Sequence, residues 1–111
     1  MAATLKVIAS VAFIANAAAN IYAPPASTIY TIIKHIHICN VTTSACWFTL
    51  YIGATGASTA GTEIFKQYNV SANGVFDYFT NRLMVSTAFL VGVAQTASAL
   101  TIDIEGEQGV V

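Results

Sequence analysis

The strictest constraint on the fold is a two-residue alternation in the middle of the chain. From Cys46 to Ile52 every second side chain belongs to one apolar set, while Trp47, Thr49 and Tyr51 make up the other set. Successive side chains of a β-strand point to opposite faces, so this segment predicts a strand with one buried face.

The rest of the chain is also predicted to form short strands separated by turns. The run Thr28–Asn40 is rich in β-branched residues, which favour strands, and Pro24-Pro25 marks its beginning because proline cannot donate to a ladder. Further strands are expected at Glu63–Val70, Val75–Met84, Ala88–Val93 and Leu100–Glu105, the last with Leu100, Ile102 and Ile104 facing inward. No segment has the 3.6-residue period of an amphipathic helix. We therefore expect an all-β protein, either an antiparallel β-sandwich or a jelly-roll-like domain.

The chain is expected to hold one domain, because 111 residues suffice for a single core. The predicted organisation is an extended N-terminal arm or opening strand at 1–20, a β-sandwich domain at 21–107 and a C-terminal tail at 108–111. Residues 1–19 also fit a secretory leader, with Lys6 ahead of a short apolar run, but we favour the arm or strand. Asn16 and Asn20 leave that run too short for a membrane span, so none is expected.

Two turn signals predict which strands pair. The polar loop 40–45 would join the strands on either side of it as a hairpin. In that hairpin Ile38 lies opposite Phe48, and Lys34 points toward the core. Asn73-Gly74, the strongest short hairpin signal, would join the two strands that flank it in the same way.

The chain carries little charge for a protein that stays alone in water. Charged residues make up 8% of the chain and apolar residues 56%, with a net charge of −1, whereas surfaces normally carry about 25–35% charged residues. The four basic residues are scattered, which excludes a phosphate-binding patch and with it a nucleic-acid partner. High apolar content with low net charge excludes disorder. Much of the surface is therefore expected to be covered by other protein.

One group of residues has the chemistry of a metal site. On a strand, His35, His37 and Cys39 share one face, and imidazole and thiolate are zinc ligands. Their Cα atoms would spread over about 13 Å, so other ligands would have to come from elsewhere. The nearest acids, which the sequence cannot place in contact with them, are Asp77, Asp103 and Glu105. The simpler interpretation, which we favour, is a polar or interfacial face without a metal.

The remaining motifs give no sign of catalysis. Cys39 and Cys46 flank one loop, but the expected register puts them on opposite faces, so free and largely buried thiols are expected rather than a disulfide. There is no Gly-x-Ser-x-Gly elbow and no phosphate-binding loop. Asp103 and Glu105 share a strand face, which solvated acids explain more simply than a catalytic carboxylate pair. The sequence predicts neither an enzyme nor a cofactor.

Several motifs resemble those of small β-sandwich virion proteins of tailed bacteriophages. That family often shows Tyr-x-x-Pro-Ala, a strand ending in Cys-Asn, an Ile-x-Ala-Asn turn and a terminal Gly-x-Glu. The corresponding segments here are Tyr22–Ala26, Cys39-Asn40, Val70–Asn73 and Glu105–Glu107. The doubled Pro24-Pro25 and a small-residue loop at 53–61 depart from the pattern. The resemblance covers residues 20–107 and implies a non-enzymatic virion component of the minor-tail or head-decoration type.

Composition and resemblance together predict a symmetric oligomer, most simply a trimer, that is located in the virion and bound to capsid or tail proteins. Contacts are expected through the N-terminal arm and the apolar face of a sheet. The candidate contact residues are Phe13, Ile14, Tyr22, Trp47, Tyr51, Tyr78 and Phe79. If residues 2–16 are an anchoring arm, their deletion should leave a folded domain that no longer joins particles.

Two other classes of function stay open. The first is a module at a phage tail tip that binds a host carbohydrate or receptor through a stacking surface of Trp47, Tyr51, Tyr78 and Phe79. The second is a secreted bacterial β-sandwich protein whose leader is formed by the N-terminal residues.

Overall fold

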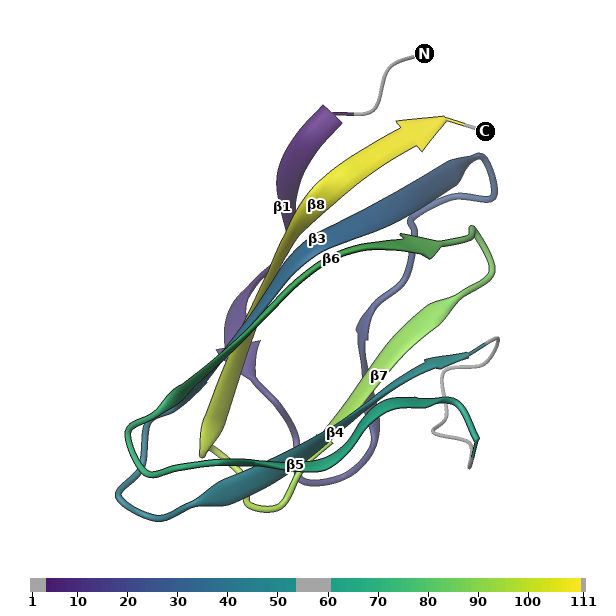
Figure 1. The fold of residues 1–111 in the computed structure, drawn as a ribbon. Helices are drawn as coiled ribbons and strands as arrows, with labels where there is room; N and C mark the ends of the chain where they lie inside the picture. Colours follow the sequence, from purple (N-terminus) through teal and green to yellow (C-terminus); the bar gives the residue numbers. More distant parts are fainter. Residues whose placement is uncertain (1–3, 54–60, 111) are drawn as a thin grey trace.

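The computed structural model describes residues 4–53 and 61–110, and within these ranges the chain forms eight strands and no helix (Figure 1). The strands are β1 (Thr4–Phe13), β2 (Ala19–Tyr22), β3 (Ile29–Asn40), β4 (Cys46–Gly53), β5 (Glu63–Val70), β6 (Val75–Met84), β7 (Phe89–Ala94) and β8 (Leu100–Val110). No helix long and apolar enough to cross a membrane is found among these residues. The prediction of an all-β protein is confirmed, although the short strand β2 was not foreseen.

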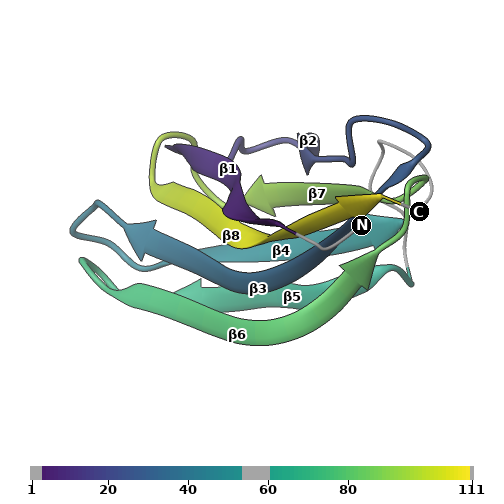
Figure 2. The ribbon, with the colours of Figure 1, turned by 90° about the horizontal axis from the view of Figure 1, so that it is seen from above.

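The strands form two four-stranded antiparallel sheets that pack face to face as a sandwich (Figures 1 and 2). The strand order is β1-β8-β3-β6 in the first sheet, called sheet A here, and β2-β7-β4-β5 in the second, called sheet B. The chain passes from one sheet to the other at every connection except the one between β4 and β5. Strands distant in sequence therefore become neighbours, as β1 and β8 do.

The inner faces of both sheets supply the core. The predicted inward faces of β4 and β8 are confirmed, because Cys46, Phe48 and Leu50 are buried, as are Leu100, Ile102 and Ile104. Phe48 also contacts a cluster of aromatic rings, with centroids 5.2 to 6.0 Å from its own. These rings belong to Phe65, Tyr68 and Phe76.

Both predicted hairpins are wrong, because the strands on either side of each turn lie in different sheets. β3 pairs with β6 and β8, whereas β4 pairs with β5 and β7. The turn at Asn73-Gly74 likewise carries the chain from β5 in sheet B to β6 in sheet A. Asn40 links the end of β3 to the following loop and to the end of β5. Its buried side-chain amide donates hydrogen bonds to the carbonyls of Ser44 (2.8 Å) and Val70 (3.1 Å). A turn signal specifies that the chain reverses, but it does not specify the partner of each strand.

A bulge in β3 puts Lys34 on the outside of sheet A and not in the core, where strict alternation placed it. Between Ile33 and His35, β3 contains one residue more than the segment of β8 with which it pairs. The Lys34 ammonium donates a 2.6 Å hydrogen bond to the Asn81 side chain and lies 3.5 Å from the Glu107 carboxylate. The extra residue leaves both Lys34 and His35 on the solvent side.

Both ends of the described chain are strands. Within the expected arm at 1–20, β1 is hydrogen-bonded along β8, and Ile14, which is only 1% exposed, is part of the core. The expected tail at 108–111 is strand through Val110, because β8 pairs with both β1 and β3. The small-residue loop expected at 53–61 lies mostly outside the described residues.

Candidate functional site

The outer face of sheet A gathers most of the ionisable groups of the chain. Directly paired residues of antiparallel strands point to the same side of a sheet. His35 lies between Glu105 of β8 and Phe79 of β6, and the next row places His37 between Asp103 and Asp77. Both histidines and four of the five acidic residues thus share this face, the acids being Asp77, Asp103, Glu105 and Glu107.

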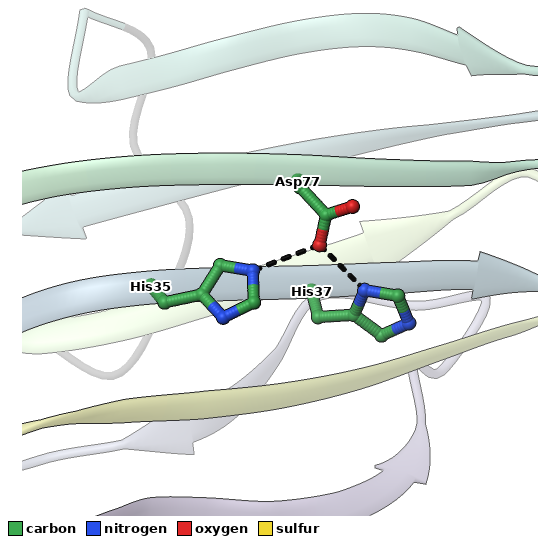
Figure 3. Close-up of side chains that lie close together, drawn as sticks. All are labelled: His35, His37 and Asp77. Carbon is green, nitrogen blue, oxygen red and sulfur yellow. Dashed lines mark hydrogen bonds and ion pairs between the residues drawn. The ribbon is translucent and has the colours of Figure 1, made fainter.

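Asp77 joins the two histidines at the centre of this face (Figure 3). Its Oδ1 atom accepts a 2.8 Å hydrogen bond from Nε2 of His35 and a 2.6 Å hydrogen bond from Nδ1 of His37. One potential ligand atom from each residue lies within 4.8 Å of the other two. We call this group, His35, His37 and Asp77, the His–His–Asp cluster.

Two neighbouring side chains hold the ring of His35. Its second nitrogen, Nδ1, lies 3.6 Å from Oε1 of Glu105. The ring also stacks on Phe79, with a centroid distance of 4.3 Å and an angle of 4° between the planes. One ring face is therefore covered, Nδ1 faces a carboxylate at a distance longer than a hydrogen bond, and Nε2 is directed at Asp77.

Cys39, which the sequence grouped with the two histidines, is not part of the cluster. It pairs with Val75 and Thr101, one row beyond His37. Both cysteines are free thiols, Cys39 half-buried and Cys46 buried. The third member, Asp77, was missed as a specific partner. The sequence does indicate, through the alternation of β6, that Asp77 lies on the exposed face. It does not show that β6 pairs with β3.

The cluster lowers the pKa of its carboxyl group. Hydrogen bonds from His37 and His35 hold the pKa of Asp77 below its ordinary value of 3.8. The charged form is thus the one that the two imidazoles favour.

This shift predicts a difference in acid stability between the wild type and Asp77→Asn. A group whose pKa is lower in the folded state stabilises the fold above its ordinary pKa, and this contribution is lost as the pH falls through the folded pKa. Between about pH 5 and pH 2 we expect the urea midpoint to fall more steeply for the wild type than for the variant. Urea titrations at stepped pH measure both slopes, and equal slopes would contradict the assignment.

The aromatic residues predicted to form one contact surface lie in three places. Trp47 and Tyr51 are on the outer face of sheet B, Phe13 and Phe79 are on the outer face of sheet A, and Tyr22 and Tyr78 pack toward the interior. The Tyr22 hydroxyl is bonded to Thr31 Oγ1 at 2.7 Å and accepts from Gln108. A single stacking surface of Trp47, Tyr51, Tyr78 and Phe79 is therefore not formed. Ile14 is enclosed in the core and cannot contact another protein.

Comparisons with known proteins leave the family of this chain open. No family model matches the sequence, and no curated protein matches it. One similar solved chain comes from the structure of the infectious bursal disease virus Gx strain, with a TM-score of 0.41 and 11% identity over 96% of this chain. Another comes from the Gt strain of the same virus, with a TM-score of 0.38 and 10% identity over 96% of this chain. This chain spans 30% of the length of each.

Proposed function

We propose that this protein is a non-enzymatic structural subunit of a bacteriophage particle, of the minor-tail or head-decoration type, that binds copies of itself through the outer face of sheet A. The observation that carries the proposal is the exposed apolar surface on the two edge strands of this sheet. Phe79 is 73% exposed and Leu5 72% exposed, in a chain with only 8% charged residues. Apolar surface of this kind marks a contact with another protein.

Six of the exposed apolar residues lie in two strips on opposite edges of sheet A. The β1 strip consists of Leu5, Val7 and Phe13, and the β6 strip consists of Val75, Phe79 and Leu83. The polar strands β8 and β3 separate the strips. Contact between the β1 strip of one copy and the β6 strip of the next would be head-to-tail, and such contacts close into rings when the rotation allows. A trimer is the smallest ring of this kind with three-fold symmetry.

The strand order supports a more specific description of the fold. Two sheets in the order β1-β8-β3-β6 and β2-β7-β4-β5 have the connectivity of a jelly roll. Jelly rolls occur in viral capsid proteins and also in lectins and cupins, so the fold is compatible with a virion subunit without selecting it. The resemblance of residues 20–107 to tailed-phage proteins supports the choice of the viral class.

Substitution of the apolar strips tests self-association. We expect Leu5→Ser and Phe79→Ser each to weaken association by about tenfold, because each removes a large exposed apolar side chain from the contact. Light scattering after size-exclusion chromatography, over a range of concentrations, measures the change. Val41→Ser is the matched control, since Val41 is 51% exposed but lies in the loop between β3 and β4. A monomeric wild type, or equal effects of all three substitutions, would overturn the proposed contact.

Immunogold labelling of purified phage particles tests the virion role. An antibody against this chain should label either the capsid, as expected for a decoration subunit, or the tail, as expected for a minor tail protein. Intact and opened particles that both stay unlabelled would overturn the proposal.

A further inference from the structure

We propose that His35, His37 and Asp77 bind one divalent transition-metal ion, with Zn²⁺ as the best match. The inference depends only on the geometry of the outer face of sheet A and stands whether or not the protein is a virion subunit.

The first argument is the convergence of three ligand atoms. Nε2 of His35, Nδ1 of His37 and Oδ1 of Asp77 all lie within 4.8 Å of one another and point to a common region (Figure 3). A tetrahedral Zn²⁺ with bonds of about 2.0–2.1 Å holds its ligand atoms about 3.3 Å apart. The two hydrogen bonds, at 2.8 and 2.6 Å, would therefore open by about 0.5–0.7 Å to admit the ion. The two histidine nitrogens, which lie within 4.8 Å of each other, would have to approach each other to about 3.3 Å by rotation of these partly exposed side chains.

The second argument is the orientation of the His35 ring. Histidine ligands of metals usually donate their second ring N–H to a carboxylate or carbonyl, which fixes the tautomer that leaves the first nitrogen free to coordinate. In His35 the second nitrogen, Nδ1, faces Glu105 at 3.6 Å, and stacking on Phe79 restricts rotation of the ring. Glu105 thus acts as a positioning residue. Nothing in a simple hydrogen-bonded pair of His35 and Asp77 requires this second carboxylate.

The third argument is the rigidity of the platform. His35 and His37 lie on β3, which is hydrogen-bonded on one side to β8 and on the other to β6, the strand that carries Asp77. A site on paired strands, here the inner strand β3 and the edge strand β6, keeps its ligands in place better than a loop does.

The charges and the ligand types favour a transition metal. Asp103, Glu105 and Glu107 place negative charge along β8, on the side of the histidines opposite Asp77, whereas the nearby Lys34 is engaged with Glu107 and Asn81. Two imidazoles and one carboxylate suit Zn²⁺ and related ions, while Mg²⁺ and Ca²⁺ prefer oxygen ligands. Three protein ligands leave a fourth position for water or for a group from a neighbouring molecule. Because the coordinating nitrogens must lose their protons, binding should release protons and weaken in acid.

Titration of the full chain with Zn²⁺ and with Co²⁺ tests the proposal. Isothermal titration should show one ion per chain for the wild type, and Co²⁺ should give the visible absorption of a nitrogen- and oxygen-ligated site. Asp77→Asn and His37→Ala are each expected to weaken Zn²⁺ binding by at least about tenfold. Glu105→Gln should weaken it by about tenfold and leave the Co²⁺ spectrum of the bound ion unchanged, because the ligands stay the same. Circular dichroism shows whether each variant is folded.

Two control variants separate this site from other sources of binding. Glu107→Gln removes one negative charge from the same face without removing a ligand, so the affinity should stay within about twofold. Cys39→Ser should leave binding and the Co²⁺ spectrum unchanged. The proposal is overturned if the folded wild type binds no Zn²⁺ below about 1 mM, or if Asp77→Asn and His37→Ala bind as the wild type does. Thiolate absorption with Co²⁺ that disappears in Cys39→Ser would also overturn it.

Discussion

Deletion of residues 2–16 is expected to abolish the soluble folded protein, not merely to detach it from its partners. The deletion removes β1 and Ile14, a core side chain that is 1% exposed. Loss of a buried isoleucine side chain alone costs about 2–5 kcal/mol. It also converts β8, an inner strand of eleven residues, into an unprotected sheet edge that can pair with other chains. Soluble yield and size-exclusion profiles measure the outcome.

Single substitutions distinguish loss of the core from loss of a surface. Ile14→Ala should lower the free energy of unfolding by about 2–5 kcal/mol, whereas Phe13→Ser, at a neighbouring side chain that is 54% exposed, should change it by about 0.5 kcal/mol or less. A deletion variant that stays monomeric and unfolds cooperatively would restore the interpretation of this segment as a separate arm.

Replacement of Gly106 by alanine is expected to destabilise the fold by about 3 kcal/mol, at the upper end of the cost of overpacking. A methyl group at this position would collide with the backbone carbonyl oxygen of Ile32 and come within 3.2 Å of the Ile33 Cα atom. These are backbone atoms of the neighbouring strand, so a change of rotamer cannot relieve the contact. The strain falls beside the β3 bulge, since Gly106 pairs with Ile33.

Gly53→Ala is the matched control for this substitution. Among the described residues, the atoms nearest to an added methyl group at Gly53 belong to the side chain of Thr62, at an ordinary contact distance of 3.5 Å. Its effect on the free energy of unfolding should stay within about 0.5 kcal/mol. Urea denaturation of the two variants measures the difference, and similar stabilities would show that the strands can separate at the bulge without cost.

Local features of the fold were predictable from the sequence, but pairings were not. Alternation identified the buried faces of β4 and β8 because each residue of a strand reports its own side. The hairpins failed because the strands on either side of each turn belong to different sheets, and their apolar faces meet across the core instead of side by side. The predicted orientation of Lys34 was wrong for a related reason. A bulge depends on how a strand pairs with its partner, so the sequence of β3 alone does not reveal it.

The candidate site shows the same division. His35 and His37 were placed on one face because both belong to one strand. Asp77 lies forty residues farther along, with a hydrogen bond that depends on the register of β6 against β3. That register is set by the packing of both sheets, and no short sequence motif predicts it. Cys39 lies one row beyond His37 on the same strand, β3, and the spacing along that strand keeps it out of the cluster.

The position of β8 also dictates the order in which the protein can be completed. Within sheet A, β1 has β8 as its neighbour, so β1 cannot pair until residues 100–110 have been synthesised. At about 5–20 residues per second, that delay is about 5–20 s. During this delay β1, with its apolar residues Leu5, Val7 and Phe13, has no partner strand. The nascent chain can therefore associate prematurely with other nascent copies.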